Sequence, residues 1–278
     1  MKLHSHNEWD PLKAVIVGTV EGFRPGLEVQ DGRTENFEQA YAVAREAFPD
    51  WYLEEVAEDL DGLCAVLSGA GATVLRPRWE DASAEFSTPN WSAAGCDIYN
   101  VRDLHIVFGN TLVVSAPSSR FRQHESAAFH RVLYSHFFQE GFRWVCAPMP
   151  RLKGKYLHEM TRTKTGLENT EELLHSRLSG GLKEVFHCLD DHEVIFDAAN
   201  IIRLNRDILF LVSCTGNQKA VRWLQETLGP EYRVHVTHAY RSSHLDSTIL
   251  PLRDGVVLLN GRSEEHTSEL QSPYVISY

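Results

Sequence analysis

The sequence lacks any stretch of about 18 consecutive apolar residues, so we expect no membrane-spanning helix. Its five cysteines are odd in number and scattered, with no C-x-x-C pair, which argues against a disulfide framework or a zinc ribbon. Positive charge is also scarce, because 27 Lys and Arg face 38 Asp and Glu, for a net charge of −11. Nothing forms a basic face, so we expect no nucleic-acid partner.

The first ten residues have neither the apolar segment of a signal peptide nor the Arg-rich pattern of a transit peptide, which predicts a cytoplasmic protein. What the chain does have is length and apolar content. Its 278 residues are 43% hydrophobic, enough to bury a sizeable core in one large domain or in two average ones.

A hairpin–helix–strand unit repeats along the chain. In the first copy, apolar runs at 104–108 and 111–115 flank Gly109-Asn110, a strong two-residue hairpin signal. A helical pattern over 121–140 and a strand at 143–146 follow. This order predicts a module in which a hairpin, a helix and a closing strand pack together.

The second copy has the same order. Apolar runs at 201–204 and 208–213 flank Asn205-Arg206, a helix is predicted over 217–228, and a strand over 232–236. A third copy begins with a hairpin of 248–250 and 256–259 and shows no helix or closing strand after it.

The N-terminal part fits the repeat more loosely. We predict strands at 14–17 and 73–75 and a helix over 51–67, whose apolar residues recur at helical spacing. Residues 21–35 and 77–100 are expected to be long loops. The whole pattern predicts an α/β fold built of repeated modules.

Four polar residues are expected at strand or hairpin ends in successive modules: Asp103, Asp197, His244 and Asp246. Equivalent ends converge on one face of a repeat fold. Carboxylates there suit a guanidinium, which pairs bidentately with them, and a histidine beside an aspartate can move protons near neutral pH. The plainer alternative is that each aspartate caps a turn and His244 is a loop histidine.

Other segments carry weaker signals. Residues 187–192 contain metal-ligand types, but their spacing fits no standard site, so we expect a solvated loop and neither a metal nor a cofactor. The basic residues within 153–164 are expected to be solvated as well.

Several blocks, in order, resemble the family of glycine amidinotransferases and inosamine-phosphate amidinotransferases. They are His6-Asn7-Glu8-Trp9-Asp10-Pro11-Leu12, Val101-Arg102-Asp103, Phe196-Asp197-Ala198-Ala199-Asn200 and His244-Leu245-Asp246-Ser247-Thr248. Any one block is weak evidence, whereas the ordered set is specific, and the resemblance extends from about the N-terminus to Gly261.

The resemblance implies a pentein fold, a five-bladed α/β propeller, and transfer of an amidino group from L-arginine to a small amine acceptor through an amidino-cysteine. It implies that His244 is the general acid/base, that Asp197 orients it and contacts the guanidinium, and that Asp103 and Asp246 hold the substrate. Asn200 stands where the glycine-using branch has Asp, which hints at a different acceptor. The oligomeric state stays open, with a homodimer as one option.

The resemblance ends abruptly after Gly261. Residues 262–278 are similar to the translation of a sequencing-library adapter, so we expect residues 1–261 to be a C-terminally truncated pentein domain and 262–278 a non-native, disordered tail. The family's nucleophilic cysteine belongs to a later module, which predicts an inactive chain.

None of the chain's own cysteines is a good substitute for that nucleophile. We expect Cys64 in the core, Cys146 and Cys214 at strand ends, and Cys96 in a loop, where a reactive thiol is conceivable. Two alternatives to the transferase remain: a guanidine hydrolase of the same fold, such as an arginine deiminase, and a non-catalytic arginine-binding protein.

Overall fold

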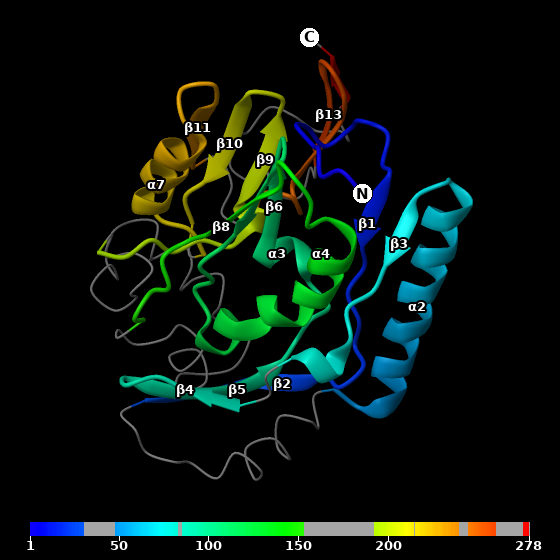
Figure 1. Cartoon of the computed structure of the whole chain (residues 1–278), viewed down its shortest axis with the longest axis vertical. Coiled ribbons are helices and arrows are strands. Elements are labelled where there is room, and N and C mark those ends of the chain that lie inside the picture. The colour runs from blue at the N-terminus through cyan, green and yellow to red at the C-terminus, as the bar shows by residue number, and fades with distance from the viewer. Residues whose placement is uncertain are drawn as a thin grey trace, which may run out of the picture. The chain divides into compact units, whose positions relative to one another are not determined.

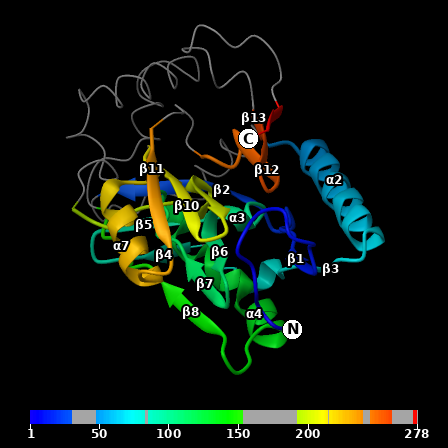
Figure 2. The same ribbon diagram turned by 90° about the horizontal axis from the view of Figure 1, so that it is seen from above.

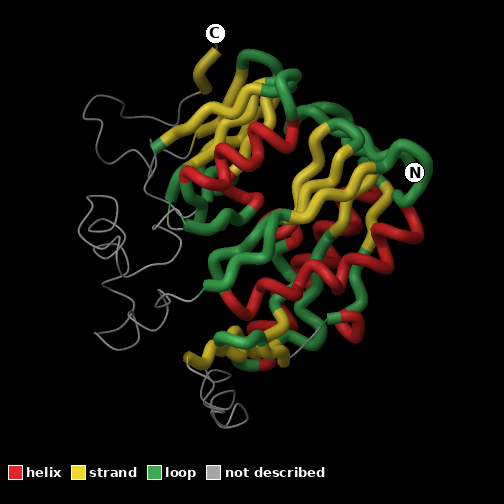
Figure 3. Tube along the Cα trace, turned by 60° about the vertical axis from the view of Figure 1, so that its left-hand side comes forward, coloured by secondary structure: helices red, strands yellow, loops and turns green. Residues whose placement is uncertain are grey.

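The computed structural model describes residues 1–30, 48–82, 85–152, 192–213, 215–238, 244–259 and 275–277. They fall into two compact units, which we describe one at a time. Unit 1 comprises residues 1–3, 11–105 and 119–143, and unit 2 comprises residues 4–10, 106–118 and 144–278. Helices and strands are intermixed along the chain, as an α/β fold requires (Figure 3).

Unit 1 begins with two parallel strands joined through a long helix. Strand β1 (Ala14–Ile16) pairs in parallel with β3 (Thr73–Leu75), and α2 (Asp50–Gly69) precedes β3 and lies beside it (Figure 1). All three elements confirm the sequence prediction. Helix α2 buries only Leu60 fully, because most of its other apolar residues are half-exposed or exposed.

The two segments that we expected to be long loops instead contain a three-stranded sheet of order β2-β5-β4. Strand β5 (Trp91–Cys96) pairs antiparallel with both β2 (Arg24–Gln30) and β4 (Glu85–Ser87). A 3₁₀ turn, η1 (Trp79–Asp81), precedes β4. The loop prediction was wrong because the alanines and glycine of β5 have little intrinsic strand preference, and burial stabilises the strand instead.

The turn between β4 and β5 is closed by a side chain. The hydroxyl oxygen of Thr88 accepts hydrogen bonds from the backbone N–H groups of Asn90 and Trp91, at 3.2 Å each. The hydroxyl also donates to the carbonyl of Trp91 at 3.1 Å. Such local side-chain bonds favour turns over regular structure.

Helical segment η2 (Arg120–Phe129) packs against the sheet of unit 1 and continues into α4 (His130–His136). The predicted helix over 121–140 therefore exists but starts as a 3₁₀ helix and ends earlier. The ring of Phe121 packs directly on the backbone of Gly26 in β2 and Gly95 in β5. A Cβ on Gly26 would lie 2.4 Å from that ring, and a Cβ on Gly95 would lie 3.1 Å from it. Only glycine allows so close an approach.

The three strands of the first predicted module are present, whereas its helical segment, η2 and α4, belongs to unit 1. Strands β6 (His105–Phe108), β7 (Thr111–Val114) and β8 (Arg143–Cys146) lie side by side in that order (Figure 2). Gly109 has a φ of 60° at the hairpin turn, a left-handed conformation typical of such turns.

The second module has the same order of elements. Strand β9 (Ile201–Leu204) pairs antiparallel with β10 (Asp207–Leu211), helix α7 (Gln218–Leu228) follows, and β11 (Arg233–Thr237) returns parallel to β10 (Figure 1). The predicted hairpin, helix and strand are all confirmed.

A core of unit 2 lies where α7 covers this second sheet. Ala220, Val221 and Leu224 of α7 share one buried cluster with Ile208 and Phe210 of β10. These helix positions recur every three to four residues, so the apolar stripe seen in the sequence is the face that the fold buries.

The third hairpin also forms. Strand β12 (Ile249–Arg253) pairs antiparallel with β13 (Val256–Leu259), which pairs in turn with β14 (Val275–Ser277). We expected 262–278 to be disordered, and three of its residues form β14 instead. The division of the chain at residue 261 and the origin of the tail stay predictions. None of the helices in the described ranges is long and apolar enough to cross a membrane.

Helix α7 starts at a side-chain cap that can be tested. Asn217 accepts a hydrogen bond from the N–H of Ala220 at 2.9 Å and donates to the carbonyl of Glu193 at 2.7 Å. We expect Asn217→Ala to lower the free energy of unfolding by about 1–2 kcal/mol, measured by urea denaturation. The exposed Glu226→Ala on the same helix is the control, and equal losses in both variants would contradict the assigned cap.

Candidate functional site

Asp197 stands directly after a buried strand-like segment of unit 2. Phe196 is fully buried and forms single β-bridges with Ala116 on one side and Gly216 on the other. The N–H of Asp197 donates to the carbonyl of Thr215 at 2.9 Å. Two neighbouring chain segments thus fix the backbone at this carboxylate, whose residue is only 5% exposed.

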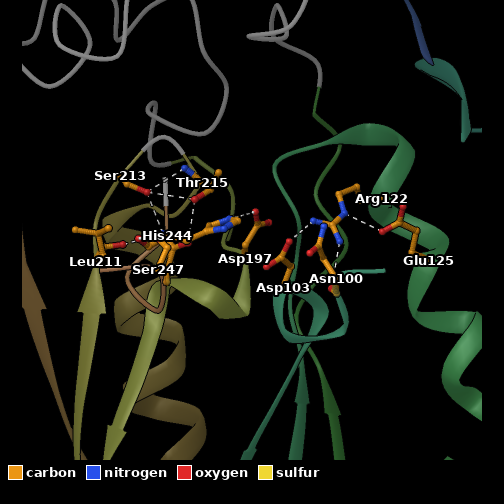
Figure 4. A network of polar contacts seen from close by, with 11 residues as sticks. Asn100, Asp103, Arg122, Glu125, Asp197, Leu211, Ser213, Thr215, His244 and Ser247 are labelled. Carbon is orange, nitrogen blue, oxygen red and sulfur yellow. Dashed lines mark hydrogen bonds and ion pairs between the residues drawn. The ribbon is translucent and has the colours of Figure 1, made fainter. Parts of the chain in front are cut away.

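His244 meets Asp197 through its ring. Nε2 of His244 and Oδ2 of Asp197 are 2.9 Å apart (Figure 4). The histidine is held by the residue after it: Leu245 is fully buried beside Ile202 and Leu211, and its N–H donates to the carbonyl of Ala199 at 3.0 Å. The pair predicted from sequence is therefore a direct contact in the structure.

The second oxygen of Asp197, Oδ1, has a different environment. Oδ1 is buried, and none of the residues that the structure describes donates a hydrogen bond to it. A buried carboxylate oxygen without a donor is costly, so this atom is a place where a donor from a ligand would be stabilising.

Asp246 lies two residues beyond His244 and shares its support. Its N–H donates to the carbonyl of Ala199 at 3.3 Å, the same oxygen that Leu245 uses. Asp246 is half-buried. The structure thus groups three of the four predicted residues, Asp197, His244 and Asp246, around the 3₁₀ turn η5 (Ala198–Asn200).

Asn200, whose identity hinted at a different acceptor, has a buried and fully hydrogen-bonded side-chain amide. Its side chain is fully buried and donates through Nδ2 to the carbonyl of Leu211 at 2.9 Å and to the hydroxyl of Ser213 at 3.0 Å. Its oxygen accepts from the hydroxyl of Thr215 at 2.9 Å. The amide therefore ties η5 to the end of β10 and to the segment that supports Asp197.

Asp103 belongs to unit 1 and lies in the one-turn helix α3 (Val101–Leu104), directly before β6, instead of at a strand end. Its Oδ2 accepts a hydrogen bond from Nη1 of Arg122 at 2.5 Å, and both side chains are largely buried (Figure 4). Nε of Arg122 donates to Oε2 of Glu125 at 2.8 Å, and Oε1 of Glu125 accepts from the N–H of Asp97 at 3.1 Å.

Burial dominates the electrostatics of this cluster. It raises the pKa of Glu125 to about 7, although the neighbouring Arg122 guanidinium opposes the shift. Burial also raises the pKa of Asp97, again against the effect of Arg122. One guanidinium thus serves more than one buried carboxylate.

Sequence reasoning did not identify Arg122, Glu125 or the buried role of Asn200. The pair Arg122 and Glu125 had one readable signal, since opposite charges three residues apart meet on a helical surface. Asn200 had none, because its partners are eleven or more residues away. The catalytic and substrate-binding roles of Asp103, Asp197, His244 and Asp246 stay predictions.

The described cysteines do not resemble activated nucleophiles. Cys96 was expected in a loop and instead ends β5, buried, where burial raises its pKa to about 11. Burial also raises the pKa of Cys146, which lies at the end of β8 as predicted. Cys64 is half-buried, not core, with Nη1 of Arg76 3.3 Å from its sulfur. Cys188 and Cys214 lie outside the described residues.

Within the described ranges, no group of three or more His, Cys, Asp or Glu could hold a metal ion. The basic residues of 153–164, and all of 187–192 except His192, lie outside these ranges.

Two groups of curated proteins are similar to this chain. Inosamine-phosphate amidinotransferase 1 of Streptomyces glaucescens is 37% identical over 260 residues, which span 92% of this chain and 68% of that protein. The mitochondrial glycine amidinotransferase of Gallus gallus is 29% identical over 272 residues, 96% of this chain and 62% of that protein. No family model matches the sequence.

Solved structures of related proteins identify the fold. The inosamine-phosphate amidinotransferase of Streptomyces griseus matches with a TM-score of 0.70 and 35% identity, over 94% of this chain and 70% of that one. Dimethylarginine dimethylaminohydrolase of Pseudomonas aeruginosa matches with a TM-score of 0.51 at 12% identity, over 90% of this chain and 70% of that one, a likeness of fold alone. The expected pentein-type α/β fold is confirmed.

The buried amide of Asn200 predicts a stability effect. Asn200→Asp removes both donors and places a carboxylate oxygen against the carbonyl of Leu211, so we expect a loss of about 1–3 kcal/mol in unfolding free energy. Urea denaturation at pH 7 measures it. Asn90→Asp, in the β4–β5 turn, is the matched control, and an equal loss at both positions would show that the network around Asn200 adds nothing.

The raised pKa of Glu125 predicts a pH dependence of stability. Because the folded pKa of about 7 lies above the reference value of 4.5, the folded chain keeps a proton that the unfolded chain releases between these pH values. The contribution of Glu125 to stability is therefore full at low pH and falls as pH rises from about 4.5 to about 7.

Glu125→Gln should flatten this part of the profile of unfolding free energy against pH. Glu231→Gln, at a surface glutamate, should leave the profile unchanged. Parallel profiles for wild type and Glu125→Gln would rule out the assigned titration.

Proposed function

Because this chain belongs to the amidinotransferase family of inosamine-phosphate and glycine amidinotransferases, we propose that it recognises L-arginine as the donor of an amidino group destined for a small amine. The observation that carries this proposal is the buried Oδ1 of Asp197, to which none of the described residues donates, next to the Asp197–His244 contact. A guanidinium can supply the missing donor, since it has five N–H groups and a permanent positive charge.

The contact between Asp197 and His244 sets the proton chemistry in this proposal. With Asp197 ionised, Nε2 of His244 carries the proton that it donates to Oδ2. Nδ1 is then the nitrogen that takes up and releases a proton during transfer. Asp197 thus has two functions, because Oδ2 fixes the tautomer of the histidine and Oδ1 receives the guanidinium.

The transfer itself needs a thiolate. In the proposed reaction, a cysteine sulfur first forms a bond to the guanidino carbon of arginine. The bond from that carbon to the side-chain nitrogen then breaks, and His244 gives that nitrogen a proton so that ornithine leaves. The nitrogen of the amine acceptor then bonds to the amidino carbon and gives a proton to His244, while the carbon–sulfur bond breaks and releases the thiolate. We propose Asp103 and Asp246 as substrate-holding carboxylates on the strength of the motifs that contain them.

We propose further that the chain as written binds arginine without turning it over. Cys96 and Cys146 have raised pKa values, the opposite of what a nucleophilic thiol needs. The Asp197–His244 pair is the acid/base half of the machinery, and none of the described cysteines qualifies as the other half.

Among acceptors, we favour an aminocyclitol-type amine over glycine. Identity is 37% to the inosamine-phosphate enzyme of Streptomyces glaucescens and 29% to the glycine enzyme of Gallus gallus. The guanidine hydrolase alternative has weaker support, since the matched dimethylarginine hydrolase shares 12% identity and therefore only the fold.

Calorimetric titration of the full chain with L-arginine tests the proposal. We expect saturable binding, and we expect Asp197→Asn to weaken it at least about tenfold, because a charged hydrogen bond of about 1.5–3 kcal/mol is lost. Asp207→Asn is the matched control. It removes another carboxylate that contacts a histidine, with Nε2 of His235 2.7 Å from Oδ1, but on an exposed part of unit 2.

Absence of arginine binding by the wild-type chain would refute the proposed ligand, and unchanged binding by Asp197→Asn would refute the assigned role of that carboxylate. An ornithine assay with glycine and with an aminocyclitol as acceptor completes the experiment. Ornithine release from the wild-type chain would show that one of its own cysteines acts as nucleophile and would overturn binding without turnover.

A further inference from the structure

Unit 1 contains a buried guanidinium that the proposed chemistry does not use. Arg122 is 8% exposed, and its side chain donates to Oδ2 of Asp103 at 2.5 Å, to Oε2 of Glu125 at 2.8 Å and to the carbonyl oxygen of Asn100 at 3.4 Å. Two of these partners, Asn100 and Asp103, belong to the segment just before β6. Arg122 itself lies in η2, nineteen residues further along the chain.

The same segment is also held from its other side. Glu125, which receives one bond from Arg122, accepts the N–H of Asp97 through its second oxygen at 3.1 Å. A continuous chain of contacts therefore runs from the backbone of Asp97 through Glu125 and Arg122 to the carboxylate of Asp103. It clamps both ends of residues 97–103 to η2.

These contacts restrict the orientation of the Asp103 carboxylate more than its side-chain rotamer preferences alone would. A guanidinium is a planar fork with fixed donor directions, so a carboxylate bonded to it is restrained in direction as well as position. Arg122 also compensates the charge of Asp103 where water is largely excluded, and removing one partner of a buried pair leaves the other uncompensated.

We propose that Arg122 is a positioning residue for substrate binding: its guanidinium fixes the carboxylate of Asp103 in the direction that receives the substrate's cationic group, and Glu125 holds Arg122 in place. This inference rests on the proposed function, because it takes Asp103 as a substrate-holding carboxylate. A carboxylate has about four acceptor sites, so the contact with Arg122 does not by itself exclude a second cation at Asp103.

The test compares arginine affinity by calorimetry in wild type, Asp103→Asn, Arg122→Lys and the double variant. Lysine keeps the positive charge but loses the fork, so we expect Arg122→Lys to weaken arginine binding by about tenfold. Since Arg122 acts through Asp103, the double variant should bind no more weakly than Asp103→Asn alone. A purely structural role for Arg122 would instead give losses that add.

Arg203→Lys is the matched control. Arg203 is also a largely buried arginine that pairs with a glutamate: its Nε donates to Oε1 of Glu8 at 2.9 Å and its Nη2 donates to Oε2 at 2.8 Å. It lies in unit 2 and contacts none of the proposed site residues. We expect this variant to bind arginine like wild type, with unfolding measured in parallel so that affinity is compared only between folded proteins.

The outcomes separate the two proposals. If wild type binds arginine and Arg122→Lys binds it equally well, the positioning role is wrong and the proposed function stands. The same conclusion follows if wild type binds arginine and the losses in the double variant add in full. Wild type that does not bind arginine overturns both. If Arg122→Lys does not fold, Glu125→Gln removes the carboxylate that holds Arg122, and affinity equal to wild type in that variant overturns the positioning role.

Discussion

The carbonyl group of Ala199 and the side-chain amide of Asn200 hold the central part of unit 2 together. The carbonyl receives the N–H groups of Leu245 and Asp246, and the amide joins the end of β10 to the segment around Thr215. Buried polar groups of this kind must be satisfied, so each of these partners is fixed once the turn Ala198–Asn200 forms. The contact between Asp197 and His244 is a consequence, because each residue lies within one or two positions of a group that the turn anchors.

The two polar clusters solve opposite electrostatic problems. In unit 1, Arg122 contacts both Asp103 and Glu125, so each of these two carboxylates has a cationic partner. In unit 2, Asp197 contacts an imidazole through one oxygen and leaves the other without a donor among the described residues. A cluster whose charged groups contact one another favours a fixed geometry, whereas a buried carboxylate oxygen without a donor favours a cationic ligand.

The repeat and its hairpins could be predicted because their signals are local. Gly109 and Asn205 adopt the left-handed backbone that their turns require, and α7 buries the stripe that its spacing shows. Strand β5 could not be predicted, because Ala93 and Ala94 form a strand only through tertiary burial. Likewise, Asp197 and His244 stood out as residue types, while the contacts of Arg122 with Asp103 and of Asn200 with Thr215 join positions whose pairing no local pattern encodes.

The absence of side chains at Gly26 and Gly95 determines where the side chain of Arg122 lies. Phe121 rests where both residues have no side chain, and Arg122 is its direct neighbour in the chain. A single methyl group at Gly26 would overlap the ring and push η2 outward, and hydrogen bonds between charged groups weaken steeply with such displacements. The geometry of the ion pair between Arg122 and Asp103 thus depends on two residues that have no side chain. Adding one methyl group at Gly26 would be enough to disturb it.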